Sequence, residues 1–330
     1  MSTILNKPFT TYRQQLKILR KRNLDISNGS KAILILKREG YYNIINGYKD
    51  IFLDIPKTKS LGEDFFKVGT TFENIFSLYD FDRNIRSILI KYLLKFETAL
   101  KTKISYHFSE HFTGNFSYLD INNFDTSNPQ KVTKLIARLS TVITNNSQPQ
   151  DQGGQIYHYI NKYKELPLWV LIKKMTLGET YHFFDALTPD MKKEIVDEFI
   201  SDYQKIYPSA TVTKHKNYVT FFHEMLMLLN HFRNVCAHDE RLYNVVFKKG
   251  GNMPKIILFH KQTSFSFKSK LFDCILILGL LLQKKDYQRL YNQMVSELSR
   301  LSEKLPQNLF NAVLLNMGFP KNWKSDLKIP

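Results

Sequence analysis

The segment 233–238, with the sequence Arg-Asn-Val-Cys-Ala-His, carries residue types that could cleave RNA without a metal ion. That reaction needs a base to take the proton of a ribose 2′-hydroxyl and an acid to protonate the leaving 5′-oxygen. A histidine titrates near neutral pH and can make either transfer. An arginine presents a fixed fork of donors to phosphoryl oxygens, and an asparagine can orient the other groups. Arg233, Asn234 and His238 are therefore candidate catalytic residues.

A helix must position this segment, and the hydrophobic pattern predicts one over 214–246. Its expected core stripe consists of Met225, Leu229, Phe232 and Cys236. At about 100° per residue, Asn234 lies about 200° from Phe232, on nearly the opposite face. Asn234, His238 and Arg241 are four and three residues apart, which would place them together on that outer face. The pattern predicts a polar cluster, with Arg233 beside it, that could meet a phosphate.

One helix supplies a single histidine, which is few for a reaction with two proton transfers. Two chains packed about a two-fold axis would bring a second copy of each group to the site. The alternative is that Arg233, His238 and Arg241 only solvate an exposed face and pair with Asp239 and Glu240. An Arg-x4-His spacing recurs by chance, so the spacing alone favours this ordinary surface.

The composition indicates a helical protein with a substantial core. Of the 330 residues, 43% are hydrophobic and 14% are aromatic, which excludes a disordered or collagen-like chain. The 13 glycines and 11 prolines are few for the many tight turns of a β-rich protein. We therefore expect an all-α fold, with one large core or two modest ones.

The chain is strongly basic, with 47 Lys and Arg against 30 Asp and Glu and a net charge of +17. Such a charge attracts polyanions, so nucleic acid, an anionic membrane surface and an acidic partner are candidates. Interleaved aromatic residues favour RNA, because bases stack on them while Lys and Arg hold phosphates. A compositional bias toward lysine would produce the same charge.

The sequence gives no sign of a membrane segment or a metal centre. The longest apolar run, 274–282, is far shorter than the roughly 20 residues that span a bilayer, and residues 1–7 lack the apolar core of a signal peptide. The two cysteines, Cys236 and Cys274, are too few for a metal cluster and fit a reducing compartment. We expect a cytoplasmic protein without a cofactor.

Helix signals recur along the chain. Capping boxes are predicted at Thr11-x-x-Gln14 and Thr70-x-x-Glu73, and the second opens the longest helical pattern. Its apolar stripe comprises Ile75, Leu78, Ile85, Leu89, Tyr92, Phe96, Leu100 and Ile104. The stretch 53–69 is expected to be a connecting loop. Further helices are expected at about 31–39, 41–48, 130–145, 167–187, 190–206, 270–283, 285–303 and 307–316.

These elements suggest three regions. They are an N-terminal helical region (1–65), a helical core (66–248) and a C-terminal helical extension (249–330), with a small hairpin or loop insertion near 249–265. We expect the three regions to form one compact unit.

Several side chains on the long helix are secondary candidates. Arg83 and Arg86 share one face and could add RNA contacts, although an ordinary solvated face is preferred. Glu97 could belong to the site or pair with the lysine four residues on. His107 and His111 have a spacing that can bind zinc, but a solvated helix face is the preferred interpretation.

The stretch 233–244, Arg-Asn-Val-Cys-Ala-His-Asp-Glu-Arg-Leu-Tyr-Asn, resembles the signature of the Abi-like abortive-infection family (the AbiD and AbiF group), a branch of the HEPN superfamily. Stretches within 7–48, 72–102 and 166–178 resemble the same family in the same order, so the likeness covers most of residues 7–245. One departure is Lys173-Lys174, where the family often has a glutamate.

The resemblance implies a HEPN-type helical bundle with extra N- and C-terminal helices, usually a homodimer in which two Arg-x4-His motifs face each other. It also implies metal-free RNA cleavage in phage defence or toxin–antitoxin control, in some relatives under an inhibitory structured small RNA. Carried over by position, Arg233 and His238 would be catalytic, Asn234 would support them and Arg241 would contact phosphate.

Three functions are open at this point. The first is an endoribonuclease that acts as a homodimer on single-stranded RNA. The second is a non-catalytic module that holds a structured small RNA in the same groove. The third is a protein scaffold, which would show no salt-dependent affinity for RNA.

Overall fold

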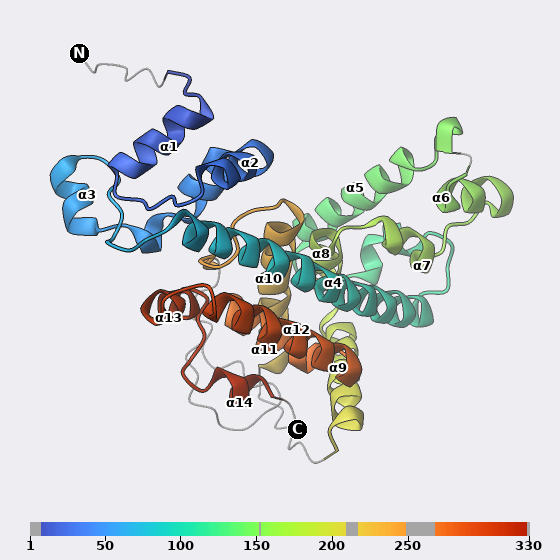
Figure 1. Ribbon diagram of the computed structural model, residues 1–330. Helices are drawn as coiled ribbons and strands as arrows, with labels where there is room; N and C mark the ends of the chain where they lie inside the picture. The colour runs from blue at the N-terminus through green and yellow to red at the C-terminus, as the bar shows by residue number, and fades with distance from the viewer. Residues whose placement is uncertain (1–7, 152, 209–216, 249–267, 329–330) are drawn as a thin grey trace.

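The computed structural model describes residues 8–151, 153–208, 217–248 and 268–328, which form helices joined by short connections (Figure 1). These residues contain no β-strand beyond isolated pairings of single residues. The all-α prediction is confirmed. Within the same ranges, no helix combines the length and the apolar character that crossing a membrane requires.

Helix α4 (Phe72–His111) is the central element, and its 40 residues run the length of the molecule (Figure 1). All eight residues of its predicted apolar stripe are buried. The helix begins at a capping box in which Thr71 accepts the Asn74 backbone N–H and the Asn74 side chain accepts the Thr71 N–H. Such a cap stabilises a helix by about 1 kcal/mol. The predicted box at Thr70 and Glu73 was one residue too early: Thr71 is the N-cap, and Thr70 is buried.

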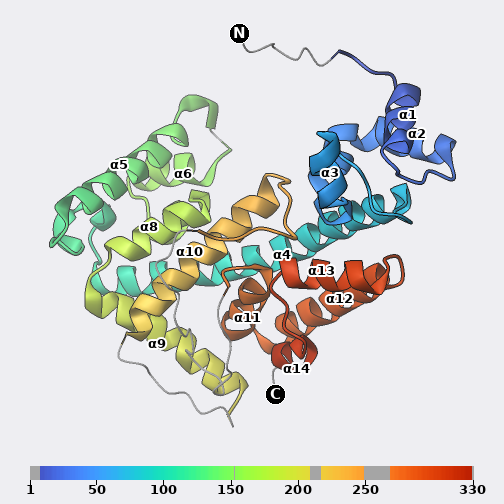
Figure 2. The ribbon, with the colours of Figure 1, turned by 90° about the vertical axis from the view of Figure 1, so that its left-hand side faces the viewer.

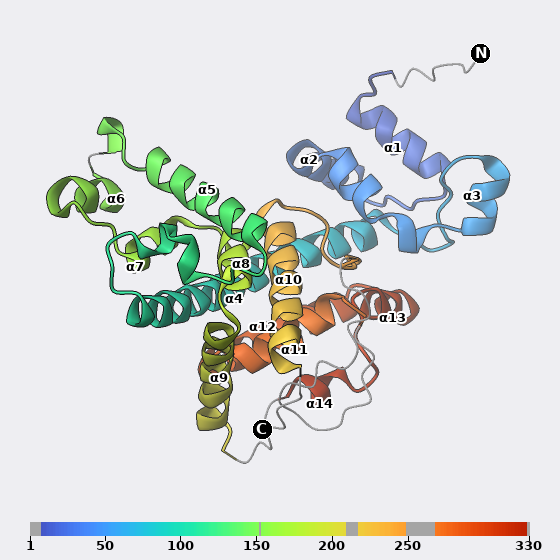
Figure 3. The same cartoon turned by 180° about the vertical axis from the view of Figure 1, so that it is seen from behind.

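Helices from the second half of the chain pack around α4 (Figures 1 and 3). Helix α12 lies along α4, α10 crosses it, and α8, α9 and α11 also contact it. The bounds are α8 (Leu177–Ala186), α9 (Pro189–Ile206), α10 (Tyr218–Ala237), α11 (Leu271–Leu281), α12 (Lys284–Ser302), α13 (Gln307–Asn316) and α14 (Trp323–Leu327). Their apolar faces and that of α4 form one continuous hydrophobic core.

The remaining helices lie at the two ends of α4 (Figure 2). Near its start are α1 (Tyr12–Lys21), α2 (Gly29–Glu39) and α3 (Ile55–Leu61); near its end are α5 (Pro129–Asn145), α6 (Gln155–His158) and α7 (Leu168–Leu171). Short π or 3₁₀ turns connect them at Tyr42–Asn46, Asp50–Phe52, Ser117–Leu119, Ile121–Asn123, Pro149–Asp151, Tyr159–Tyr163 and Ile172–Lys174. The predicted capping box of Thr11 and Gln14 is present at the start of α1.

Three predicted elements differ from the structure. The expected loop 53–69 contains α3, which Asp54 caps through the Lys57 N–H. The expected helix 167–187 is divided, because the backbone at Met175 is extended. The expected helix 214–246 ends at Ala237. The hairpin or loop expected near 249–265 lies outside the described residues.

Candidate functional site

Helix α10 ends in a sharp reversal of the chain at the candidate histidine. His238 is the C-cap, and Asp239 follows with a φ of 55°, in the left-handed region that Asp tolerates better than most residues. The Glu240 N–H then donates to the Val235 carbonyl at 3.1 Å, the long bond of a Schellman-type helix end. Arg241 therefore lies beyond the helix, and the predicted outer face shared by Arg241 with His238 does not exist.

Arg233 leans from α10 toward α4. Its Nε lies 3.6 Å from Glu97 Oε2, and its Nη1 donates to Asn234 Oδ1 at 3.4 Å. Glu97 Oε1 also pairs with Lys101 at 2.6 Å, which confirms the predicted pairing, and Lys101 donates to the Met175 carbonyl. The Arg233 side chain is 21% exposed, so a buried carboxylate holds one edge of the guanidinium while the rest reaches the surface.

Asn234 and His238 are both exposed. The His238 backbone N–H donates to the Asn234 carbonyl at 2.9 Å, and no hydrogen bond of the imidazole is found within the described chain. The ring is thus open to a ligand. Cys236, between them, is half-buried, and burial raises the pKa of its thiol to about 12, so it stays protonated and is no nucleophile at neutral pH.

Arg86 is not a surface residue. It is 4% exposed, and its Nη1 donates to Asp82 at 2.5 Å while its Nη2 donates to Asp239 at 2.6 Å. Burial would lower the pKa of Arg86, but the Asp82 carboxylate raises it above its ordinary value, so the guanidinium stays charged. The predicted RNA contact is replaced by a buried bridge from α4 to the residue that follows His238.

Asp82 is the centre of this bridge and was missed from the sequence. Its carboxylate accepts the Tyr48 hydroxyl at 2.7 Å and the backbone N–H groups of Leu242 and Tyr243 at 3.0 and 2.6 Å. Burial raises the pKa of Asp82, and these bonds and Arg86 oppose that rise. We call Asp82, Arg86 and Asp239 the loop clamp. The available signal was the position of Asp82 within the apolar stripe of α4, where a charge must have partners.

The other two arginines predicted to contact RNA also have protein partners. Arg241 donates to the Gly47 carbonyl and lies 3.2 Å from Asp50, which joins the chain reversal to the N-terminal region. Arg83 pairs with Glu39 at 3.0 Å but keeps a side chain that is 56% exposed. Arg83 is therefore more accessible to a ligand than Arg241, whose side chain is 34% exposed.

The two histidines with zinc-like spacing lie at hydrogen-bond distance from glutamates of another helix. His107 lies 2.8 Å from Glu198, and His111 lies 2.8 Å from Glu194, both on α9. Within the described ranges, no group of three or more His, Cys, Asp or Glu side chains is arranged to hold a metal ion.

Comparison with known proteins identifies the family. The family model described as Abi-like protein matches residues 34–244, which include α4, the loop clamp and the Arg233–His238 segment. No curated protein and no solved structure matches the chain. Since the match extends over more than half of the sequence, the chain belongs to the Abi-like protein family.

Proposed function

We propose that this protein is an endoribonuclease of abortive-infection defence, with Arg233, Asn234 and His238 at its active site. Membership of the Abi-like family links the chain to abortive infection. The observation that supports cleavage most directly is the exposed His238 imidazole at the end of α10, on the same helix as an Arg233 guanidinium that contacts Glu97 and Asn234. The loop clamp fixes the backbone that directly follows the histidine.

The proposed reaction is attack of a ribose 2′-oxygen on the adjacent phosphorus. One imidazole takes the 2′-hydroxyl proton as the new P–O bond forms. The bond from phosphorus to the 5′-oxygen breaks, and an imidazolium gives that oxygen a proton. The products are a 2′,3′-cyclic phosphate and a free 5′-hydroxyl, and no redox change occurs. Arg233 would stabilise the charge on the phosphoryl oxygens.

Two proton transfers favour a homodimer in which two copies of His238 share one cleft. One neutral imidazole would act as the base and one charged imidazole as the acid. A two-fold axis close to the end of α10 would bring both copies to the same phosphate.

The test is incubation of purified protein with labelled single-stranded RNA in EDTA. We expect fragments with 2′,3′-cyclic phosphate ends, and we expect His238→Ala to lower the rate by about 10²- to 10⁴-fold, the usual contribution of acid–base catalysis. His111→Ala is the matched control, because His111 is a partly exposed histidine on α4 that pairs with Glu194. Tight binding of RNA that stays intact would instead support a non-catalytic RNA-holding protein.

A further inference from the structure

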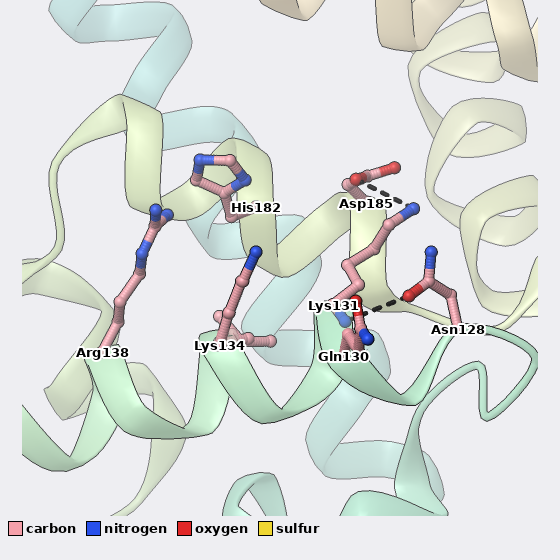
Figure 4. A pocket seen from close by; sticks show the side chains of 8 residues that line it. Asn128, Gln130, Lys131, Lys134, Arg138, His182 and Asp185 are labelled. Atoms are coloured by element: carbon pink, nitrogen blue, oxygen red, sulfur yellow. Dashed lines mark hydrogen bonds and ion pairs between the residues drawn. The ribbon is translucent and has the colours of Figure 1, made fainter.

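A second basic site lies between α5 and α8, apart from the residues assigned above. It is a cavity of about 300 Å³. Figure 4 shows side chains from the two helices pointing into it, and its lining residues are Asn128, Gln130, Lys131, Lys134, Leu135, Arg138, His182 and Asp185. The volume is at the lower end of the range for small-molecule sites, about 300–1,000 Å³, and suits a single nucleotide unit.

One end of the cavity is already neutralised. Asp185 on α8 lies 3.1 Å from Lys131 on α5 and 3.1 Å from His223 on α10. Burial opposes ionisation, but the hydrogen bonds from His223 and Lys131 outweigh it and lower the pKa of Asp185 to about 2. The carboxylate is therefore fully charged at neutral pH and ties three helices together. Lys131 serves this contact and is not available to a ligand.

The other end carries cations without a counter-charge. Lys134 and Arg138 are one turn apart on α5 and point toward His182 (Figure 4). Both are exposed, and neither has an ion pair or a side-chain hydrogen bond in the part of the chain that the structure describes. Two like charges one turn apart repel each other, so an anion between them would relieve that repulsion.

The His182 ring provides the opposite wall. Burial, and then the nearby Arg138 guanidinium, lower the pKa of His182, while Asp185, Glu179 and His223 have smaller effects. The ring is thus neutral at physiological pH. A neutral imidazole can donate one hydrogen bond to an anion and adds no further positive charge to the empty cavity.

We propose that this cavity binds a phosphate group of RNA, held by Lys134 and Arg138 with a hydrogen bond from His182. A phosphodiester matches the site because its oxygens can take the arginine fork and the lysine ammonium together, while the adjoining ribose fills the rest of the volume. A carboxylate alone would leave most of the cavity unfilled. The assignment of RNA as the source rests on the proposed function, whereas the phosphate chemistry does not.

The first experiment measures RNA affinity against salt concentration in the His238→Ala background, so that the RNA stays intact. We expect Lys134→Gln/Arg138→Gln to weaken binding and to reduce the slope of log K against log salt by about 0.7–1.4, the loss of one or two contacts to single-stranded RNA. The matched control is Arg13→Gln/Lys17→Gln, which removes the same charges at the same spacing from exposed positions on α1. Equal slopes in the two double variants would overturn the site.

The second experiment separates the phosphate site from the ribonuclease proposal. The His182 ring signals, assigned with His182→Gln, are followed by NMR in the His238→Ala background during titration with inorganic phosphate, 5′-AMP, a 12-nucleotide RNA, acetate and chloride. Saturable shifts with RNA support a backbone site, and shifts with phosphate and AMP but not RNA support a free-nucleotide site. The latter result leaves the cavity assignment intact while counting against the RNA substrate. Shifts with acetate equal to those with phosphate, or with none of these ligands, would refute the proposal.

Discussion

The Arg233 guanidinium lies between a buried carboxylate and an exposed amide. Its Nε and Glu97 Oε2 are 3.6 Å apart, and neither atom has a hydrogen bond within the described residues. The fork geometry of arginine lets one edge face Glu97 while another donates to Asn234. A lysine at this position would keep the charge but could not meet both partners and a phosphate at once.

We therefore expect Arg233→Lys to lower kcat on RNA by about 10²- to 10³-fold, as when a positioned donor to a developing oxyanion is lost. RNA affinity should change much less, because the net charge is kept. Single-turnover rates measured beside binding curves will separate these quantities. An equal loss in affinity and rate would mean that Arg233 binds the ground state as strongly as the transition state.

The pKa of His182 depends on the charge of the neighbouring Arg138. Because Arg138 contributes to the lowered pKa of His182, we expect Arg138→Gln to move that pKa upward, though burial will keep it below the ordinary value. An NMR titration of the ring measures this shift. Lys17→Gln on α1 serves as the control for a distant lost charge. An unchanged His182 titration in Arg138→Gln would show that the guanidinium does not face the ring in solution.

Some residues of the site could be predicted from the sequence and others could not. Residues 233–238 were predicted from their chemistry and their family likeness, and Glu97 was recognised as a partner of Lys101. The contact between Glu97 and Arg233 joins residues that are far apart in the chain. The spacing of residues within one helix cannot predict such a contact. For Arg86, a helix-face argument could not distinguish a surface arginine from one buried between two carboxylates.

The end of helix α10 determines which residues lie on the same face as His238. A helix continued through residue 246 would have carried Arg241 onto the same face as His238. The reversal at Asp239 prevents this, and it depends on a non-glycine residue in the left-handed region. Glycine is the usual signal for such an end, and residues 238–241 include no glycine, so this reversal could not be predicted from the usual pattern. By contrast, α4 has a long apolar stripe and a capping residue, and the start of this helix was predicted to within one residue.

The loop clamp should be essential to both stability and rate. We expect Asp82→Asn to lower the free energy of unfolding by about 3 kcal/mol, because one member of a buried ion pair is removed and its partner loses its main counter-charge. Chemical denaturation measures this change. Asp80→Asn is the control on the same helix: Asp80 makes a partly exposed pair with Arg300 and should contribute less than about 1 kcal/mol.

Removing the charge of Asp239 should affect the loop after His238 without unfolding the protein. Asp239→Asn keeps a residue that tolerates the left-handed conformation but removes the charge that meets Arg86. We expect a folded protein with a lower kcat and faster hydrogen exchange at residues 239–243. Unchanged exchange there, together with wild-type activity, would show that the clamp does not position His238.

The contact of Asp185 with Lys131 and His223 should make part of the free energy of unfolding depend on pH. The pKa of Asp185 is about 2 in the folded chain, against an ordinary value of 3.8. A group whose folded pKa is lowered stabilises the protein above its unfolded pKa, and this contribution is lost as the pH falls from the ordinary value through about 2. We expect Asp185→Asn to be less stable at neutral pH and to lose less additional stability across this acid range. Parallel acid-unfolding curves for both proteins would contradict the role of Asp185.

For the molecule as a whole, the number of chains that make one active site can be measured without a structure of the dimer. Wild-type and His238→Ala chains are co-refolded in equal amounts, and activity per total protein is compared with the pure wild type. If one cleft needs both histidines, random pairing leaves about one quarter of the activity; if each chain acts alone, about one half remains. A residual near one half would rule out the shared cleft.

The path of the chain around Asp82 has a consequence for engineering. Tyr48 donates to this carboxylate, and Gly47 and Asp50 hold Arg241 just beyond the chain reversal. A fragment that starts at residue 66 would keep the whole of α4 and α10, yet Asp82 would lose one of its four partners and Arg241 would lose both of its own. Shortened versions made for expression would then appear inactive for a reason unrelated to their chemistry. Residues 47–50 hold the chain that follows the histidine, and the region that carries them should be retained in any minimal form of the protein.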